Sequence, residues 1–558
     1  MNTRYIFSLA TLASVATLTA CIDEIEPQDS TVTIEQINNS GNATVLADAI
    51  SSSLAGKFVY SEDDQYPFDF GYPSLMVMRD VMGQDDATRA TWYSYWYGVV
   101  DLRPNSVIAQ FPWTLYYTWI KNCNAIIAGA ANATSDDDRR NVGRAYATRA
   151  AMYSDLAQMY GKTTYALNKE CITVPIVTEN TTTDAATNNP NATNEQIWKF
   201  ILDDLDNAEK YLTAELDDPT DVYHVGLNAI YGLRARACLV MQNWTDAVHY
   251  ARLAQEGHPL MDEAQWTDPN NGFNTPTPSW IWAVRFATDD PCILLNDADS
   301  SWGSQMCIEI DPMSSGCGYA ANYGQPHCID RHLFESIPTT DFRRKVFVDF
   351  AVNSLASRDE VLNFLSAYSA HPSWLLRCGT SSLNTNGGGL EVKFRTIGGE
   401  GGRANQLLGF AVSVPLMRAE EMKLIEIEAL GMQNESEGIE ALTAFAQTRD
   451  AAYVYGSHNE AYGSQSIATS FQNEVWWQRR VELWGEGFST LDIKRLSKGI
   501  IRSYEGSNHP DGYQWNTSAT PDWMTLVIPQ SEINYNTACQ QTVSPAPLVG
   551  NSAPVVAF

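Results

Sequence analysis

The sequence is short of basic residues and of histidine, and several common catalytic patterns are missing from it. Its 558 residues contain 36 Lys plus Arg against 66 Asp plus Glu, which gives a formal net charge of −30, and only 8 His. This charge repels nucleic acid and acidic lipid unless a local basic patch overrides it. No G-x-S-x-G or H-E-x-x-H pattern occurs, so we predict that the protein is not an enzyme.

Cysteine is present but not in the spacing that metal sites use. None of the 10 Cys form a C-x-x-C pair, and the close pair His327 and His332 has no matching cysteine pair. We therefore expect no bound metal and no other cofactor. One polar region holds five cysteines, and in an exported protein such a cluster can form disulfides: Cys292, Cys307, Cys317, Cys328 and Cys378.

The N-terminus has the pattern of a secretory signal. Arg4 precedes an apolar stretch over 5–20 that is too short, and too rich in Ala, Ser and Thr, for a membrane span of about 20 strongly apolar residues. We predict that residues 1–20 are a signal peptide. The sequence Leu-Thr-Ala-Cys that ends at Cys21 resembles the bacterial lipobox, in which the cysteine becomes the acylated first residue. The acidic residues that follow resemble a signal for export to the outer face of the outer membrane in Bacteroidetes.

Long helices are predicted in two parts of the chain. Residues 113–127 place aromatic and apolar side chains three and four positions apart, and residues 135–161 open with Ser135 and three Asp, which suit a helix start. Thr193 and Gln196 have capping-box spacing. Residues 229–259 match the tetratricopeptide pattern, in which small residues lie where two antiparallel helices meet and a proline ends the second. Further helices are expected within 414–498.

Between these helical parts, residues 262–412 are rich in Gly, Asn, Ser, Pro and Cys, with only short apolar runs. We interpret them as an irregular insertion in a helical scaffold that covers about 104–260 and 414–498. Irregular segments on a rigid scaffold commonly carry function, because loops face solvent.

The chain resembles the SusD/RagB family of outer-membrane lipoproteins. The resemblance covers nearly the whole mature chain and rests on blocks that occur in a characteristic order: “RAYATRAAMYSDLAQMYG”, “RAEEMKLIEIEAL”, “RRVELWGEGFSTLDIKRL” and “IPQSEINYN”. It implies a mainly α fold, with four tetratricopeptide-like helix pairs in a right-handed helical scaffold beside a large, irregular, loop-rich ligand-binding half. That domain would span 46–558, after a lipidated tether over 21–45.

The resemblance also implies a function. A protein of this family binds a nutrient, usually an oligosaccharide, and delivers it to a SusC-like TonB-dependent transporter. The expected location is the extracellular face of the outer membrane, with a lipid anchor through Cys21. Alternatives are peptide capture by a RagB-like component of a peptide importer, a surface glycosidase and an adhesin. No nucleic acid partner is expected.

Aromatic rings that stack on sugars, with polar neighbours for the hydroxyl groups, are the expected binding residues. Residues 84–97 supply the candidates Trp92, Tyr95, Trp96, Asp85 and Arg89. These aromatics fit core packing equally well. The insertion supplies rings among polar residues, which we expect to be exposed: Trp302, Tyr319, Tyr323 and Trp374.

One charged set is predicted to be structural. Its members lie at helical spacing and should pair across helices to hold the scaffold, without contacting a ligand: Arg479, Arg480, Glu482 and Glu486.

Overall fold

The computed structural model describes residues 43–57, 66–89, 92–294, 300–313, 318–381, 386–543 and 555–556. The predicted signal peptide, the lipidation site Cys21 and nearly all of the predicted tether lie outside these ranges. The chain divides into two units, Met1–Ala43 and Thr44–Phe558, and the fold described below is that of the second unit.

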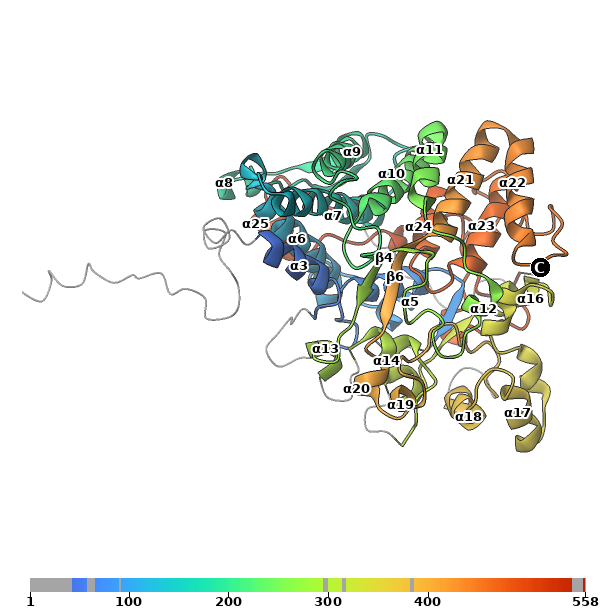
Figure 1. The fold of residues 1–558 in the computed structure, drawn as a ribbon. Helices are drawn as coiled ribbons and strands as arrows, with labels where there is room; N and C mark the ends of the chain where they lie inside the picture. Colours follow the sequence, from blue (N-terminus) through green and yellow to red (C-terminus); the bar gives the residue numbers. More distant parts are fainter. Residues whose placement is uncertain are drawn as a thin grey trace, which may run out of the picture. The chain divides into compact units, whose positions relative to one another are not determined.

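The long helices pack against one another in a continuous series. Along the series α6–α7–α9–α10–α11–α21 each helix packs on the next, and α21 then contacts both α22 and α23. In Figure 1 the helices α9, α10, α11, α21 and α22 follow one another along the upper part of the picture. The members are α6 (Val107–Ile127), α7 (Asp136–Tyr160), α9 (Asn194–Tyr211), α10 (Leu227–Met241), α11 (Trp244–Gln255), α21 (Ala419–Gln433), α22 (Glu435–Gln447) and α23 (Ser470–Glu482). The helix α24 (Ser489–Arg495) follows α23 and contacts α4 (Tyr72–Val81) and α7.

Local sequence signals explain where these helices begin and end. The Ser135 side chain accepts a hydrogen bond from the backbone N–H of Asp138, and Thr193 and Gln196 form the predicted capping box. Between α10 and α11, small residues bring the two backbones close, since Ala235 and Ala247 are completely buried. The predicted tetratricopeptide-like helical fold is therefore confirmed.

Short elements occupy the chain between α11 and α21, and Figure 1 draws most of them below the long helices. They are α12 (Glu263–Trp266), β4 (Trp280–Arg285), α13 (Pro291–Leu294), α14 (Trp302–Met306), α15 (Tyr319–Asn322), β5 (His327–Ile329), α16 (Arg331–Ser336), η3 (Phe342–Val346), η4 (Phe350–Ser354), α17 (Arg358–Leu365), α18 (Pro372–Ser381), α19 (Gly399–Arg403), α20 (Gln406–Gly409) and β6 (Ser413–Arg418).

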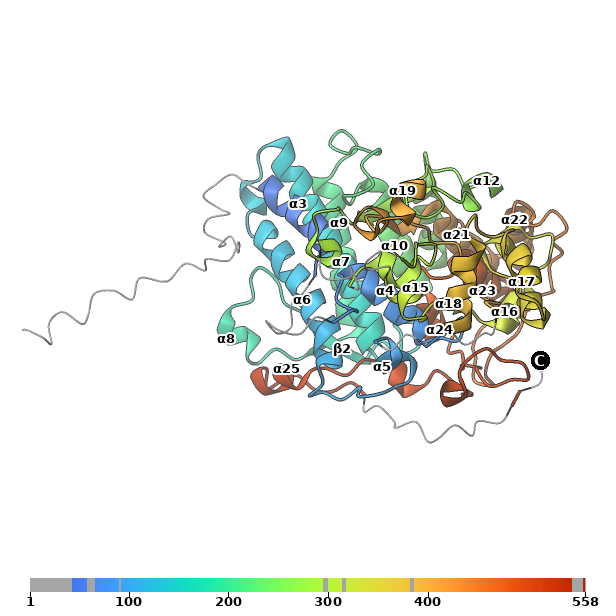
Figure 2. The same cartoon turned by 90° about the horizontal axis from the view of Figure 1, so that it is seen from below.

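The remaining elements lie nearer the ends of the chain. The C-terminal segment returns to the first long helices, since the N–H of Leu526 donates to the carbonyl of Met159 in α7 at 2.8 Å. Its helix α25 lies near α8 (Figure 2). These elements are α3 (Ala43–Ser53), α4 (Tyr72–Val81), β1 (Asp86–Thr88), α5 (Ser94–Tyr97), η1 (Ala130–Asn132), β2 (Ile172–Pro175), α8 (Thr183–Ala186), β3 (Asn191–Thr193), η5 (Asp511–Tyr513), η6 (Asp522–Met524) and α25 (Gln530–Tyr535).

Strand pairs connect the irregular part to the rest of the unit. Over the described ranges three two-stranded antiparallel sheets form, β1–β5, β2–β3 and β4–β6. In the first sheet Asp86 lies opposite Ile329 and Thr88 lies opposite His327. In the third, β6 leads directly into α21. Because the β1–β5 pair is antiparallel, it places the segment after β1 beside the segment before β5.

The charged side chains of α23 pair with other elements, as predicted. Arg479 lies 2.7 Å from Asp492 of α24, and Arg480 lies 2.5 Å from Asp85. Glu482 is within 3.3 Å of three guanidinium groups, those of Arg343, Arg418 and Arg449. Burial acts to raise the pKa of Glu482, but these three charges lower it overall. Glu486, just after α23, pairs with Arg418 at 2.8 Å and with Lys393 at 2.7 Å.

Three of the five cysteines of the insertion form no disulfide in the part of the chain that the structure describes. Cys292, Cys307 and Cys328 are free thiols in the core, so the disulfide prediction is wrong for these three. The thiol of Cys292 instead donates to the carbonyl of Ala55 at 3.3 Å. Each thiol is packed as a small apolar side chain. Cys317 lies outside the described residues.

In the part of the chain that the structure describes, none of the helices combines the length and the hydrophobicity that crossing a bilayer requires.

Candidate functional site

Two predicted stacking rings are buried in the core. Trp96 is 0 % exposed and meets Phe68 edge-on, with ring centroids 5.3 Å apart. Trp302, expected to be exposed, is 1 % exposed and lies 5.1 Å from the ring of Phe394. The polar composition around Trp302 was misleading because α14 is packed inside the irregular part. Neither ring is available for stacking in this conformation.

Asp85 is also buried, and it pairs with a scaffold residue. Nε of Arg480 donates to both carboxylate oxygens of Asp85, at 3.0 and 2.9 Å. Burial raises the pKa of Asp85, and the opposing charge of Arg480 only partly offsets this effect. Both oxygens already have a donor, so the geometry favours a structural role over contact with a sugar hydroxyl.

The other predicted aromatics are at least partly accessible. Trp92 and Tyr95 are half-buried against the aromatic cluster around Phe68. The rings of Tyr319 and Tyr323 are 4.9 Å apart, and Tyr323 is 48 % exposed. Trp374 is half-buried and stacks on His371, with ring centroids 3.7 Å apart. A ligand role for these five residues stays a prediction.

Arg89, one of the predicted ligand-binding residues, lines an open pocket. We call this the polar pocket. Its volume is about 360 Å³, within the size range of small-molecule sites, roughly 300–1,000 Å³. It is lined by Arg89, Arg331, Phe350, Asn353, residues 506–511 and Gln514.

The β1–β5 sheet and its neighbours assemble the polar pocket. Arg89 directly follows β1, and Arg331 is the first residue of α16, which directly follows β5. Asp330 caps α16 by accepting a hydrogen bond from the N–H of Leu333 at 3.0 Å. Phe350 and Asn353 come from η4. Because the β1–β5 pair is antiparallel, the end of β1 lies beside the start of β5, so Arg89 and Arg331 come from opposite ends of a sheet only three residues long.

Asn508 and Gly506 attach the loop 506–514 to the start of α16. The side-chain oxygen of Asn508 accepts from the N–H of Arg331 at 2.9 Å, and its NH₂ group donates to the carbonyl of Ile329 at 3.0 Å. Gly506 has φ of +83°, and a Cβ there would lie 3.3 Å from Nη1 of Arg331. Glycine therefore suits both the backbone and the close approach.

A buried hydrogen-bond network holds the floor of the polar pocket. Nδ1 of His509 lies 2.5 Å from the hydroxyl of Tyr97, and Nε2 lies 3.0 Å from the carbonyl of Gln84. The hydroxyl of Tyr504 donates to Asp330 at 2.5 Å. Burial acts to raise the pKa of Asp330, but hydrogen bonds from His509 and Tyr504 hold it below its ordinary value. These contacts fix the loop before any ligand binds.

Several polar groups of the polar pocket keep hydrogen-bonding capacity. The side-chain oxygen of Asn353 accepts from the N–H of Gly388 at 3.1 Å, which leaves its NH₂ group as a donor. Gln514 donates to the carbonyl of His509 at 2.8 Å, which leaves its side-chain oxygen as an acceptor. Asp511 contributes an exposed carboxylate. The pocket can therefore both donate to and accept from hydroxyl groups.

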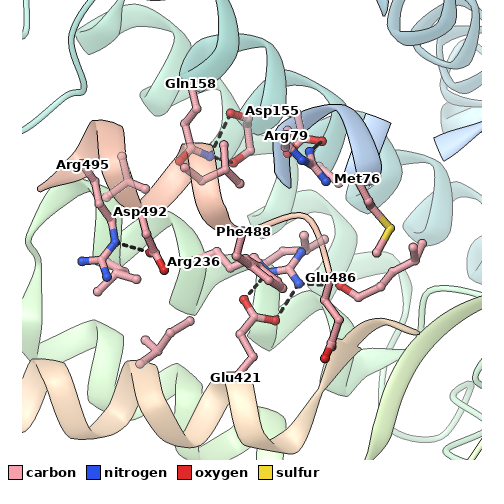
Figure 3. A pocket seen from close by; sticks show the side chains of 18 of the residues that line it. Met76, Arg79, Asp155, Gln158, Arg236, Glu421, Glu486, Phe488, Asp492 and Arg495 are labelled. Atoms are coloured by element: carbon pink, nitrogen blue, oxygen red, sulfur yellow. Dashed lines mark hydrogen bonds and ion pairs between the residues drawn. The ribbon is translucent and has the colours of Figure 1, made fainter. Parts of the chain in front are cut away.

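A second, internal cavity is less suited to a sugar. It lies among α4, α7, α10, α21 and α24 and measures about 50 Å³ (Figure 3), which is room for a few water molecules. Its charges are already paired, Arg79 with Asp155 at 2.6 Å and Arg236 with Glu421 at 2.6 Å. This cavity belongs to the packing of the helices.

Sequence reasoning found Arg89 but missed most of the polar pocket. Arg331 and Asn353 lie in the insertion, whose aromatic residues were singled out instead. The loop 506–514 lies outside both predicted binding segments. Its sequence “SNHPDGYQ” over 507–514 has the Pro, Asp and Gly of a polar turn, and this signal would have indicated an exposed loop.

Comparison with known proteins identifies the fold. Residues 74–239 match a SusD-like family model described as “Starch-binding associating with outer membrane”. No curated protein matches the sequence. Among solved structures, the chain is similar to a SusD-like carbohydrate binding protein from Bacteroides vulgatus, with 20% identity, a TM-score of 0.66 and coverage of 91% of this chain and 98% of that one.

Two further structures support the same fold over nearly the full length. A SusD superfamily protein from Bacteroides thetaiotaomicron is 17% identical, with a TM-score of 0.62 and coverage of 90% and 99% of the two chains. Surface glycan-binding protein A from Bacteroides thetaiotaomicron, solved in complex with laminarihexaose, is 16% identical, with a TM-score of 0.60 and coverage of 92% and 99%. At these identities the likeness concerns the fold.

Proposed function

We propose that this chain, which belongs to the SusD-like family, captures an oligosaccharide at the cell surface and holds it in the polar pocket. The observation that carries the proposal is the pocket itself. It is open, about 360 Å³ in volume, and it combines remaining donors and acceptors with walls that a buried network holds in place. A preformed site loses less conformational entropy when a ligand binds.

The delivery step of the proposal rests on family resemblance. The oligosaccharide passes to a SusC-like TonB-dependent transporter in the outer membrane, and the acyl chain on Cys21 holds the protein at the extracellular face. Support comes from the family description, which names both starch binding and association with the outer membrane. The laminarihexaose complex of a protein with this fold supports the choice of ligand class.

The charges of the polar pocket favour binding over glycoside hydrolysis. Hydrolysis generally uses two carboxyl groups that flank the scissile bond. Of the residues that line the pocket, all of them in the described ranges, Asp511 is the only one with a carboxyl group. The arrangement suits reversible capture.

Isothermal titration calorimetry with a panel of oligosaccharides of equal length tests the proposal. Asn353→Ala and Gln514→Ala each remove one hydrogen-bonding side chain, worth about 0.5–1.5 kcal/mol, so each should weaken binding by roughly twofold to tenfold. The control Asn180→Ala changes an exposed asparagine that does not line the pocket. Binding that is equal in all four proteins would place the site elsewhere, and the absence of binding to every glycan would refute the ligand class.

A further inference from the structure

The charged side chains that line the polar pocket are mainly basic, whereas the whole protein is acidic. The chain has 36 basic residues to 66 acidic ones, whereas the pocket is lined by two arginines, Arg89 and Arg331, and one carboxylate, Asp511. At physiological ionic strength, charges beyond about 8 Å are largely screened. A ligand in the pocket therefore responds mainly to these groups and to the carboxylates beside them, Glu335 on Arg331 and Asp330 on His509.

Arg89 has the greater capacity to bind an anion. Its side chain is exposed at the end of β1 and lines the pocket. Within the described ranges, no carboxylate lies within ion-pair distance of it. Most arginines on the scaffold are paired, as Arg480 is with Asp85 at 2.5 Å. An arginine held at a pocket without a counter-ion can take one from the ligand.

Arg331 is held in place and keeps donors for a ligand. Its Nε donates to Glu335 at 2.7 Å, and its guanidinium lies 5.5 Å from the centroid of the Phe350 ring. The only other hydrogen bond of this side chain in the described structure is a long one, 3.5 Å, from Nη1 to the carbonyl of Gly506. The side chain is 41 % exposed. Its terminal nitrogens can therefore assist Arg89, although Glu335 offsets part of the charge.

We propose that the polar pocket selects oligosaccharides that carry an oxyanion, such as the carboxylate of a uronic acid or a sulfate ester, and that Arg89 binds this group. This inference rests on the proposed function and narrows its substrate class. A guanidinium presents two parallel N–H groups that match two oxygens of a carboxylate or sulfate. A neutral sugar offers only hydroxyl groups at the same place, so it gains less from Arg89.

The test compares three ligands of equal length by calorimetry with the full-length protein: an oligogalacturonate, a sulfated oligosaccharide and a neutral oligosaccharide. At least one of the anionic ligands should bind about tenfold tighter than the neutral one, because charge-assisted hydrogen bonds are roughly twice as strong as neutral ones. This preference should shrink at high salt. The oxyanion that binds tighter identifies the natural group as carboxylate or sulfate.

Variants connect the preference to Arg89. Arg89→Gln should abolish the preference and leave the thermal unfolding midpoint unchanged, and Arg89→Lys should restore part of it. The matched control Arg139→Gln changes a partly exposed arginine of α7 that does not line the pocket, and it should retain the full preference.

Equal binding of neutral and anionic ligands would overturn the inference, and so would a preference that persists in Arg89→Gln. If only the neutral oligosaccharide binds, and Asn353→Ala loses that binding, the oxyanion preference is rejected but the proposed function is upheld. If no glycan binds at all, both the proposed function and the preference fail.

Discussion

Because Asp85 pairs with Arg480, replacing Asp85 tests whether its side chain stabilises the fold or binds the ligand. We consider Asp85→Asn, which keeps the shape of the side chain and removes its charge. The side chains are only 8 % and 4 % exposed, respectively. Breaking a buried pair on one side generally costs about 3–5 kcal/mol, because an uncompensated charge stays buried.

The surroundings of Arg480 reduce this cost somewhat. Nη2 also donates to the hydroxyl of Tyr462 at 3.2 Å, and the guanidinium lies 4.5 Å from the centroid of the Trp476 ring. The backbone carbonyl of Asp85 keeps its bond from Trp484 at 2.8 Å. We therefore expect a loss near the lower end of that range, about 3 kcal/mol of unfolding free energy, measured by urea denaturation.

A double-mutant cycle completes the experiment. The cycle uses Asp85→Leu, Arg480→Met and the variant that combines them. The combined variant removes both charges and should recover much of the stability that either of these single changes loses. Should Asp85→Asn unfold like wild type while losing glycan affinity, Asp85 would be a ligand residue and the structural assignment would be refuted.

Two further predictions concern a buried ring and a buried acid. Trp302→Ala should lower the free energy of unfolding by about 3–5 kcal/mol. Trp374→Ala changes a half-buried ring and should lower it clearly less. Equal losses in denaturant titrations of the two variants would contradict the burial assigned to these rings. Burial raises the pKa of Asp80 from 3.8 to about 7. The contribution of Asp80 to stability is therefore full below about pH 4 and falls as pH rises towards 7. The stability of wild type relative to Asp80→Asn should decline over that interval, and a difference independent of pH would show that Asp80 titrates normally.

The sequence predicted the helical part of the structure well, because helix signals are local. The capping box at Thr193 and the N-cap at Ser135 each involve residues only a few positions apart. The small residues of α10 and α11 lie in two helices that follow each other directly in the sequence. The pairing of Arg479 and Arg480 was predictable for a similar reason, since charges at helical spacing on an apolar helix require partners. The identities of these partners were not predictable.

Burial in the irregular part could not be predicted from composition. Trp302 lies among polar residues in sequence, yet α14 packs its ring against Phe394, which is 92 residues later in the chain. Composition also failed to predict that Cys292, Cys307 and Cys328 are free thiols. Each of these side chains is buried in the core without a disulfide partner.

By itself the sequence determined the class of fold, the helices and the family resemblance, since these depend on periodicity, capping and short ordered motifs. Only the tertiary structure decided where the pocket lies and which side chains line it. The antiparallel pairing of β1 with β5 places Arg89 and Arg331 at the two ends of one short sheet, and the bonds of Asn508 attach the loop 506–514 to the start of α16. The bonds of His509 to Tyr97 and to Gln84 join segments more than 400 residues apart. No local pattern encodes them, because each depends on how the whole chain packs.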